Sequence, residues 1–300
     1  MISKHIDLLK EKNIVKESTV VMLGIFDGVH TAHTHLIKEG VKRSGEENLV
    51  SVVFTFGVNL KKGGSITDNS LKEKYISQTG ADILVYQEVS SEFLSLAPED
   101  FFKLLVQNLK VKIIYVGENY TFGKEKTGNT EVLKKLGEKY GVEVNMLNLD
   151  KRGGEVISSS LIKKYLGEGN VKKANLFLGR NYEIEGIIQH GNHIGNTIGF
   201  PTVNIYPKKN MFLPKYGVYR TKVITKYGTF KGVTNIGVKP TVSKPRLSVE
   251  TYIIGLDKNM YGEKITLEIL DFIRPETKFS NLEQLKLQIE KDKKEAENEN

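Results

Sequence analysis

The sequence predicts an α/β domain with a doubly wound, mostly parallel sheet, followed by a small antiparallel β-barrel with a C-terminal helix. Three observations lead to this fold class. The chain has 300 residues, which is long for one average domain and comfortable for two. Short apolar runs alternate with helical patterns over residues 19–147, whereas polar and apolar residues alternate within short segments beyond residue 179. We therefore expect the domains at residues 1–178 and 179–300.

In the first half, the apolar runs predict buried strands and the intervening patterns predict helices. The strands are expected at residues 20–23, 50–56, 82–86, 111–117 and 142–147, and the helices at residues 34–45, 71–80, 98–109 and 130–141. Pro98 is a favourable helix start, and Gly80 and Gly141 are favourable helix ends. Ligands of such sheets bind at the carboxyl ends of the strands, so the loops there are candidate sites.

The second half begins after two short helices, which are expected within residues 157–178 and are separated at Gly167 to Gly169. Alternating segments then predict the strands of a barrel at residues 182–191, 200–206, 217–237, 247–255 and 263–273. A helix is expected over residues 281–292. The polar tail at residues 293–300 is expected to be frayed.

Composition excludes several classes of protein. The chain has no cysteine, which excludes disulfides and thiolate metal sites, and no apolar run long enough to span a bilayer or to form a signal peptide. We therefore expect a cytoplasmic protein without a membrane partner. The net charge of +8 suits anionic partners, including phosphorylated small molecules. No helix–turn–helix spacing, zinc-ligand set or aromatic–basic stripe supports a nucleic-acid partner.

The segment GIFDGVHTAH, residues 24–33, follows the first buried strand of the predicted sheet. It places His30 and His33 at the start of a helix, where unpaired backbone N–H groups and the helix dipole attract anions. Two imidazoles there would neutralise charge on a triphosphate. The alternative is a pair of surface histidines at a helix start, and the spacing alone leaves both interpretations open.

Two further loops fall at positions where the same ligand could reach them. Residues 117–123 follow a buried strand, and residues 157–160 precede a helix. The serines of the second loop offer hydroxyls and amides to phosphate, and Lys163 lies one helical turn on. The alternative is that these serines are ordinary helix caps.

GIFDGVHTAHTHL resembles the G-x-F-D-G-x-H-x-G-H-x-x-L element of bacterial bifunctional riboflavin kinase/FAD synthetases. The segments VGENYTFGKEKTG and ISSSLIKKYL resemble the later nucleotide-site elements of that family. The resemblance continues, in order, through LGRNYEIEGIIQHGNHIGNTIGFPTVNIYP, GVYRTKV, GVTNIGVKPTV, VETYIIG and MYGEKITLEILDFIRPETKF. It covers nearly the whole chain, and GFPTVN is its most specific motif.

The resemblance implies a Rossmann-like nucleotidyltransferase domain followed by a riboflavin kinase barrel. The barrel would phosphorylate riboflavin to FMN, and the first domain would transfer AMP from ATP to FMN, giving FAD and pyrophosphate. ATP would be the co-substrate of both reactions and Mg²⁺ their metal. The family's nucleotide site corresponds here to Gly24, Phe26, Asp27, His30, His33, Asn119, Ser158, Ser159, Ser160 and Lys163.

The kinase site can also be argued from chemistry. Thr202 and Asn204 of GFPTVN project to the same face of a strand because side chains alternate, and their oxygens suit Mg²⁺ beside phosphate. The resemblance assigns both to metal and nucleotide, and places Glu250 at the position of the catalytic base. The remaining ATP or flavin contacts are assigned to Gly191, Gly195, Gly199 and Arg274. Taken singly, Thr202, Asn204 and Glu250 could be ordinary strand residues.

Several positions depart from the family pattern. In the nucleotidyltransferase half these are Ala32, Asn59, Asn119, Thr121 and Lys163, and in the kinase half Asn196. A lysine cannot make the bidentate phosphate contact of an arginine. Two alternatives follow: a riboflavin kinase with a degenerate first domain, and a non-catalytic flavin- or nucleotide-binding regulator. Glu250 together with GFPTVN argues against the second. The oligomeric state is not predicted.

Overall fold

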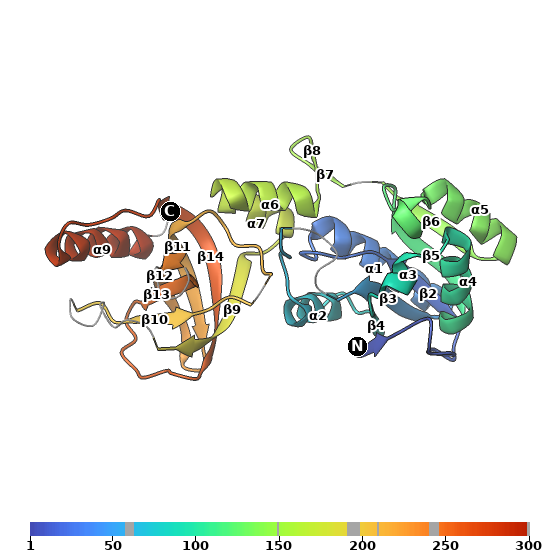
Figure 1. The fold of residues 1–300 in the computed structure, drawn as a ribbon, viewed down its shortest axis with the longest axis horizontal. Helices are drawn as coiled ribbons and strands as arrows, with labels where there is room; N and C mark the ends of the chain where they lie inside the picture. Colours follow the sequence, from blue (N-terminus) through green and yellow to red (C-terminus); the bar gives the residue numbers. More distant parts are fainter. Residues whose placement is uncertain (58–62, 149, 191–198, 209, 240–245, 299–300) are drawn as a thin grey trace. The chain divides into compact units, whose positions relative to one another are not determined.

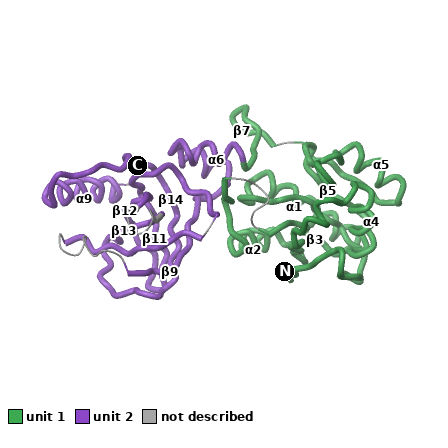
Figure 2. Tube along the Cα trace, in the orientation of Figure 1, with its two compact units in different colours: residues 1–159 green, residues 160–300 purple. Residues whose placement is uncertain are grey.

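The chain forms two compact units, Met1–Ser159 and Ser160–Asn300 (Figure 2). The structure is a computed structural model. It describes residues 1–57, 63–148, 150–190, 199–208, 210–239 and 246–298. Each unit is described by itself.

The first unit contains the expected parallel sheet (Figure 1). Its strands are β1 (Ile2–Ile6), β2 (Thr19–Leu23), β3 (Val50–Phe56), β4 (Ile83–Gln87), β5 (Val111–Gly117) and β6 (Glu143–Leu147). They lie in the order β1-β4-β3-β2-β5-β6, and every neighbouring pair is parallel. The direction of winding changes between β2 and β5, so the loops after these strands meet at the switch point. The edge strand β1 was not predicted, because ISKHI is half polar.

The helices of this unit are α1 (Thr31–Glu46), α2 (Asn69–Ser77), α3 (Ser91–Leu94), α4 (Pro98–Leu109) and α5 (Thr130–Tyr140), with a short 3₁₀ turn η1 (Lys124–Lys126). The predicted start of α4 is confirmed, with Pro98 in its first turn. Gly141 ends α5 in the left-handed conformation, as predicted. Helix α2 ends at Ser77 instead, and Gly80, with φ of +86°, lies in the turn that leads to β4.

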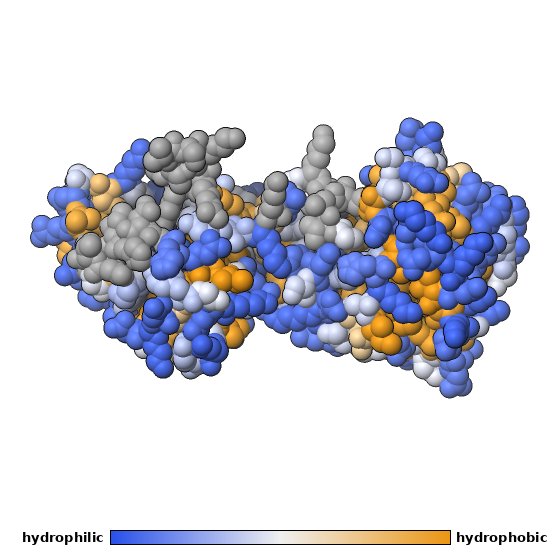
Figure 3. Space-filling view, turned by 60° about the horizontal axis from the view of Figure 1, so that its bottom comes forward, coloured by the Kyte–Doolittle hydropathy of each residue, from blue (hydrophilic) through white to orange (hydrophobic). Residues whose placement is uncertain are grey.

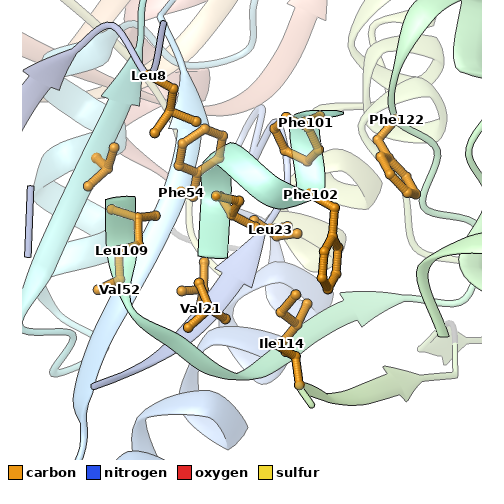
Figure 4. Packing of buried hydrophobic residues seen from close by; sticks show 14 of the residues in the cluster. Leu8, Val21, Leu23, Val52, Phe54, Phe101, Phe102, Leu109, Ile114 and Phe122 are labelled. Atoms are coloured by element: carbon orange, nitrogen blue, oxygen red, sulfur yellow. The ribbon is translucent and has the colours of Figure 1, made fainter. Parts of the chain in front are cut away.

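Alternate residues of each strand pack on opposite faces of the sheet, as a sheet covered on both sides requires. On one face Val21, Leu23 and Ile114 pack with Phe101 and Phe102 of α4 (Figure 4). On the other face, Val20 and Met22 belong to a cluster that includes Leu36 and Ile37 of α1. The first unit is therefore a three-layer domain whose buried sheet fixes the positions of the loops at its carboxyl edge.

A small hairpin and two helices follow the sheet. Strands β7 (Lys151–Arg152) and β8 (Glu155–Val156) pair with each other. Helix α6 (Ser159–Glu168) and helix α7 (Val171–Leu178) are the two predicted short helices. The break between them is confirmed at Gly169, whose φ is +83°.

The second unit contains the predicted barrel, closed in the order β10-β13-β12-β11-β14-β9. Its strands are β9 (Tyr182–Gln189), β10 (Thr202–Ile205), β11 (Gly217–Thr225), β12 (Gly228–Lys239), β13 (Arg246–Ile253) and β14 (Lys264–Arg274). All neighbouring strands are antiparallel. Closure leaves no sheet edge unpaired, which lets a small barrel be stable.

The C-terminal helix α9 (Leu282–Glu297) is longer than predicted. The expectation of a frayed tail from residue 293 is wrong, because the last turn is held against the barrel. The side chains of Lys231 and Arg220 donate to the main-chain carbonyls of Glu297 and Asn298 at 2.7 and 3.2 Å. Ala296 is buried against Val218 and Val233. These contacts satisfy carbonyls that a free helix end leaves to water.

In the face shown in Figure 3, hydrophilic residues cover much of both units, and the apolar residues gather mainly in a broad area on the first unit. In the described part of the chain, none of the helices has the length and apolar character needed to cross a membrane.

Candidate active sites

The first candidate site is the loop between β2 and α1, which has an unusual backbone. Phe26 and Val29 have φ angles of +49° and +41°, in the left-handed region that branched side chains rarely occupy. Residue 24 has no room for a side chain, because a Cβ there would lie 2.9 Å from the Phe26 ring. Strained backbone of this kind is found where the surrounding structure enforces a functional geometry. The loop is thus held in one shape rather than left to relax.

Three hydrogen bonds hold Asp27 and its neighbour in place. The Ile66 N–H donates to the Asp27 carboxylate at 2.8 Å, and the Ser159 hydroxyl donates to the Asp27 carbonyl at 2.8 Å. The Gly28 N–H donates to the Thr67 hydroxyl at 3.1 Å. Segments distant in the sequence therefore fix this loop, and Ser159 of the predicted serine loop is one of them.

His30 and His33 form a stacked pair at the N-terminus of α1. His30 is the N-cap residue, and its Nδ1 accepts a hydrogen bond from the His33 N–H at 3.3 Å. The two rings are 3.5 Å apart at their centroids and nearly parallel. The rings of Phe26 and His33 are nearly perpendicular, with their centroids 5.2 Å apart. Because a helix N-terminus carries the positive end of the helix dipole, this arrangement suits phosphate.

The other residues predicted for this site are placed as follows. Asn119 and Thr121 are exposed in the loop after β5, which neighbours β2 at the switch point. Ala32 is half-buried in the first turn of α1. Ser160 and Lys163 lie on α6, counted with the second unit, and Ser158 just precedes it. Asn59 lies outside the described residues.

Lys72 was not predicted as part of any site. It lies on α2, is only 3% exposed, and its Nζ donates to the carbonyls of Ile25 and Phe56 at 2.9 and 3.0 Å. In the sequence it is one of many lysines on a helical pattern, which usually face solvent. The sequence held one indication that Lys72 is buried. It precedes the buried Ile76 by four residues, so the two side chains lie on the same face of the helix.

The second candidate site lies on the barrel, where β10 and β13 are paired. Asn204 is opposite Glu250 in the register, and the Thr202 hydroxyl donates to a Glu250 carboxylate oxygen at 2.6 Å. Asn204 is buried, whereas Thr202 and Glu250 are half-buried. Alternation along the strand predicted a shared face for Thr202 and Asn204, and the pairing of β10 with β13 adds Glu250 to it.

A cavity of about 240 Å³ adjoins this group on the Thr202 side. Ile188, Ile253, Leu256 and Met260 provide its apolar walls, and Thr202 contributes a polar group to its lining. Asp257, Lys258 and Asn259 add charged and polar groups to the lining, so the cavity offers both apolar walls and polar partners to a small molecule.

Arg274 is already engaged by a buried carboxylate. Its guanidinium donates to Asp292 of α9 from Nη2 at 2.7 Å and from Nε at 3.0 Å, and Asp292 is 2% exposed. This ion pair attaches α9 to β14, and a ligand contact by Arg274 stays a prediction. Gly199 has φ of +82°. Gly191, Gly195 and Asn196 lie outside the described residues.

Oxygen donors suited to Mg²⁺ are present in the barrel site, where Thr202 and Asn204 offer a hydroxyl and an amide oxygen on one face. Among the described residues, no group of three or more His, Cys, Asp or Glu side chains could hold a metal ion. A metal bound here would thus need further oxygen ligands from a phosphate or from water, as Mg²⁺ usually does.

Two family models match the chain. The FAD synthetase model matches residues 12–161, and the riboflavin kinase model matches residues 178–299. Helices α6 and α7 occupy most of the interval between the two matches.

Curated relatives match nearly the full length. The protein of Buchnera aphidicola subsp. Schizaphis graminum is 34% identical over 290 residues, which cover 93% of each chain. That of Bacillus subtilis is 34% identical over 310 residues, covering 98% of this chain and 97% of its own. That of Escherichia coli K12 is 32% identical and covers 92% of this chain and 91% of its own. All three are named bifunctional riboflavin kinase/FMN adenylyltransferase.

A solved structure from Streptococcus pneumoniae, described as a macrolide-efflux protein, has the same fold. It covers 100% of both chains with a TM-score of 0.90 and 29% sequence identity.

Proposed function

Because the chain belongs to the bacterial bifunctional riboflavin kinase/FMN adenylyltransferase family, we propose that its barrel converts riboflavin to FMN and its parallel-sheet domain converts FMN to FAD. The presence of both family domains along one chain is the observation that carries this proposal. It favours the bifunctional enzyme over the kinase with a degenerate first domain and over the non-catalytic regulator. We place the boundary between the functional domains at residues 178/179, at the end of α7.

For the kinase reaction, Glu250 is proposed as the base that accepts the proton of the riboflavin 5′-hydroxyl. The hydrogen bond from Thr202 fixes one carboxylate oxygen, so the base is oriented before substrate arrives. Thr202 contacts Glu250 on one side and lines the cavity on the other. We therefore assign the cavity to the adenosine part of ATP, with the phosphates passing Thr202 toward the flavin.

Mg²⁺ belongs to this proposal as the metal of the kinase site. Thr202 and Asn204 would hold it, since they bring two oxygens to the same face. When bound, it would neutralise charge on the phosphates during transfer. The burial of Asn204 keeps its amide oxygen in a fixed position for this role.

For AMP transfer, the loop from Gly24 to His33 is proposed to hold the triphosphate of ATP. This reaction needs no general base, because the FMN phosphate is already an anion when it attacks. What it needs is the placement of two anions together and the neutralisation of their charge. The N-terminus of α1 and the stacked pair His30 and His33 meet that need. Asn119, Ser158 and Ser159 are proposed as further residues of this site, whereas the roles of Ser160 and Lys163, which belong to the second unit, stay predictions from the resemblance.

The test is product analysis by chromatography with the full chain. One mixture contains Mg²⁺-ATP and riboflavin, and the other Mg²⁺-ATP and FMN. We expect FMN and then FAD from the first, and FAD with pyrophosphate from the second. FMN alone from the first mixture and no FAD from the second would identify a monofunctional riboflavin kinase. If neither mixture yields a flavin product, the assignment of the chain as an enzyme is refuted.

A further inference from the structure

A buried lysine joins the ends of two neighbouring strands at the nucleotide-site edge of the sheet. The Lys72 Nζ donates to the carbonyl of Ile25, in the loop after β2, and to the carbonyl of Phe56, the last residue of β3. The Thr55 hydroxyl is 3.5 Å from the same Nζ and itself donates to the Ile25 carbonyl at 2.9 Å. The Lys72 ammonium and the Thr55 hydroxyl therefore both hold Ile25, which directly precedes Phe26 and Asp27.

The lysine is in an unfavourable place for a charge. Burial lowers its pKa to about 8, and the negative charge of Asp27 acts in the opposite direction. The Tyr86 ring lies 5.9 Å from Nζ. Ile76, one turn further along α2, and Tyr86 belong to the apolar cluster on this face of the sheet. A methionine or leucine would avoid the desolvation of an ammonium, so packing alone does not account for a lysine here.

The loop it contacts is the strained one. Phe26 and Val29 have positive φ angles, and such a backbone relaxes unless its neighbours hold it. The hydrogen bonds of Lys72 and Thr55 at Ile25 act directly before this strained stretch, whereas those of Ile66 and Thr67 act within it. Lys72 of α2 therefore holds the residue before the strained stretch, and the segment before α2 holds the stretch itself.

We propose that Lys72 is a positioning residue for AMP transfer, which holds the loop from Gly24 to His30 in the shape that receives the triphosphate. This inference rests on the proposed function of that loop. Lys72 does not touch the substrate. Its ammonium fixes the Ile25 carbonyl, and through it the backbone that carries Asp27 and the His30 cap.

The test compares Lys72→Met with the control Lys74→Met, an exposed lysine on the same helix. A misplacement of about 1 Å at a reacting group can lower a rate about 10²-fold. We therefore expect Lys72→Met to lower the kcat for FAD formation from FMN by about that factor, with KM for FMN and ATP changed less than about threefold. Riboflavin phosphorylation in the barrel should stay unchanged, and circular dichroism of the full chain should show that the first unit is folded. Lys74→Met should behave as wild type in both reactions.

A second readout does not depend on activity. Amide hydrogen exchange, followed by mass spectrometry, should rise in the peptide covering residues 24–30 in Lys72→Met and not in Lys74→Met. If wild-type protein makes no FAD, the proposed function fails, and the exchange result alone decides whether Lys72 holds the loop. Unchanged exchange and unchanged FAD formation in a folded Lys72→Met protein would overturn the inference.

Thr55→Val is the second variant, for the case in which Lys72→Met does not fold. It keeps the shape of the side chain and removes the hydroxyl that donates to Ile25. We expect a smaller fall in FAD formation and a smaller rise in exchange over residues 24–30, both in the same direction. Wild-type behaviour of Thr55→Val in both measurements would overturn the inference in that case.

Discussion

At the scale of single residues, the contact between Thr202 and Glu250 leads to a specific prediction about the base of the kinase reaction. Glu250→Gln keeps the size of the side chain but removes the base, so kcat for riboflavin phosphorylation should fall by about 10²-fold or more. Binding of riboflavin and Mg²⁺-ATP should remain, as measured by titration, because the contacts are kept. Thr202→Ser, which retains the hydroxyl, is the matched control and should lose little. A Glu250→Gln enzyme with normal kcat would exclude Glu250 as the base.

Residues also show where sequence reasoning ends. Thr202, Asn204 and Glu250 could be proposed as one site because two lie in one motif and alternate along a strand. Their pairing across β10 and β13 is what brings them together, and no local pattern states it. Lys72 was missed for the opposite reason. A lysine in a helix ordinarily faces water, and only its contacts with Ile25 and Phe56 show that this one does not.

At the scale of elements, the alternation of strands and helices was sufficient to predict both sheet types. The periods of the buried residues differ between the halves, and this difference is local in the sequence. The short elements α3, η1, β7 and β8 were not predicted, and two longer elements were not foreseen correctly. Strand β1 is stabilised by pairing with β4, which lies some eighty residues on. The last turns of α9 are polar along the sequence and are held by Lys231 and Arg220 of the barrel. Long-range contacts, not local propensity, decide such cases.

The ion pair between Arg274 and Asp292 should determine how firmly α9 is attached. Asp292→Ala leaves a guanidinium without its buried carboxylate, so we expect a loss of about 3 kcal/mol in the free energy of unfolding. Urea unfolding followed by circular dichroism measures it. Glu295→Ala, at an exposed position of α9, is the control and should change stability by less than about 0.5 kcal/mol. Equal stability of the two variants would show that the ion pair between Arg274 and Asp292 does not contribute to the attachment of α9.

At the scale of the whole molecule, the two proposed reactions belong to different compact units. Glu250 lies in the barrel, and the stacked pair His30 and His33 lies in the parallel-sheet unit. FMN is the product of one site and the substrate of the other. Each reaction should therefore be removable by a single substitution without loss of the other.

A mixture of two such variants tests this independence. Glu250→Gln should make FAD from added FMN but only slowly from riboflavin, at a rate lowered by about 10²-fold or more. His33→Ala should stop at FMN because the triphosphate site loses a neutralising group. Mixed in equal amounts with riboflavin and Mg²⁺-ATP, the two should together form FAD after a lag in which free FMN accumulates. Chromatography of the flavins over time shows both the lag and the product. If each variant keeps its own activity but the mixture makes no FAD, FMN must pass between sites of the same chain without release.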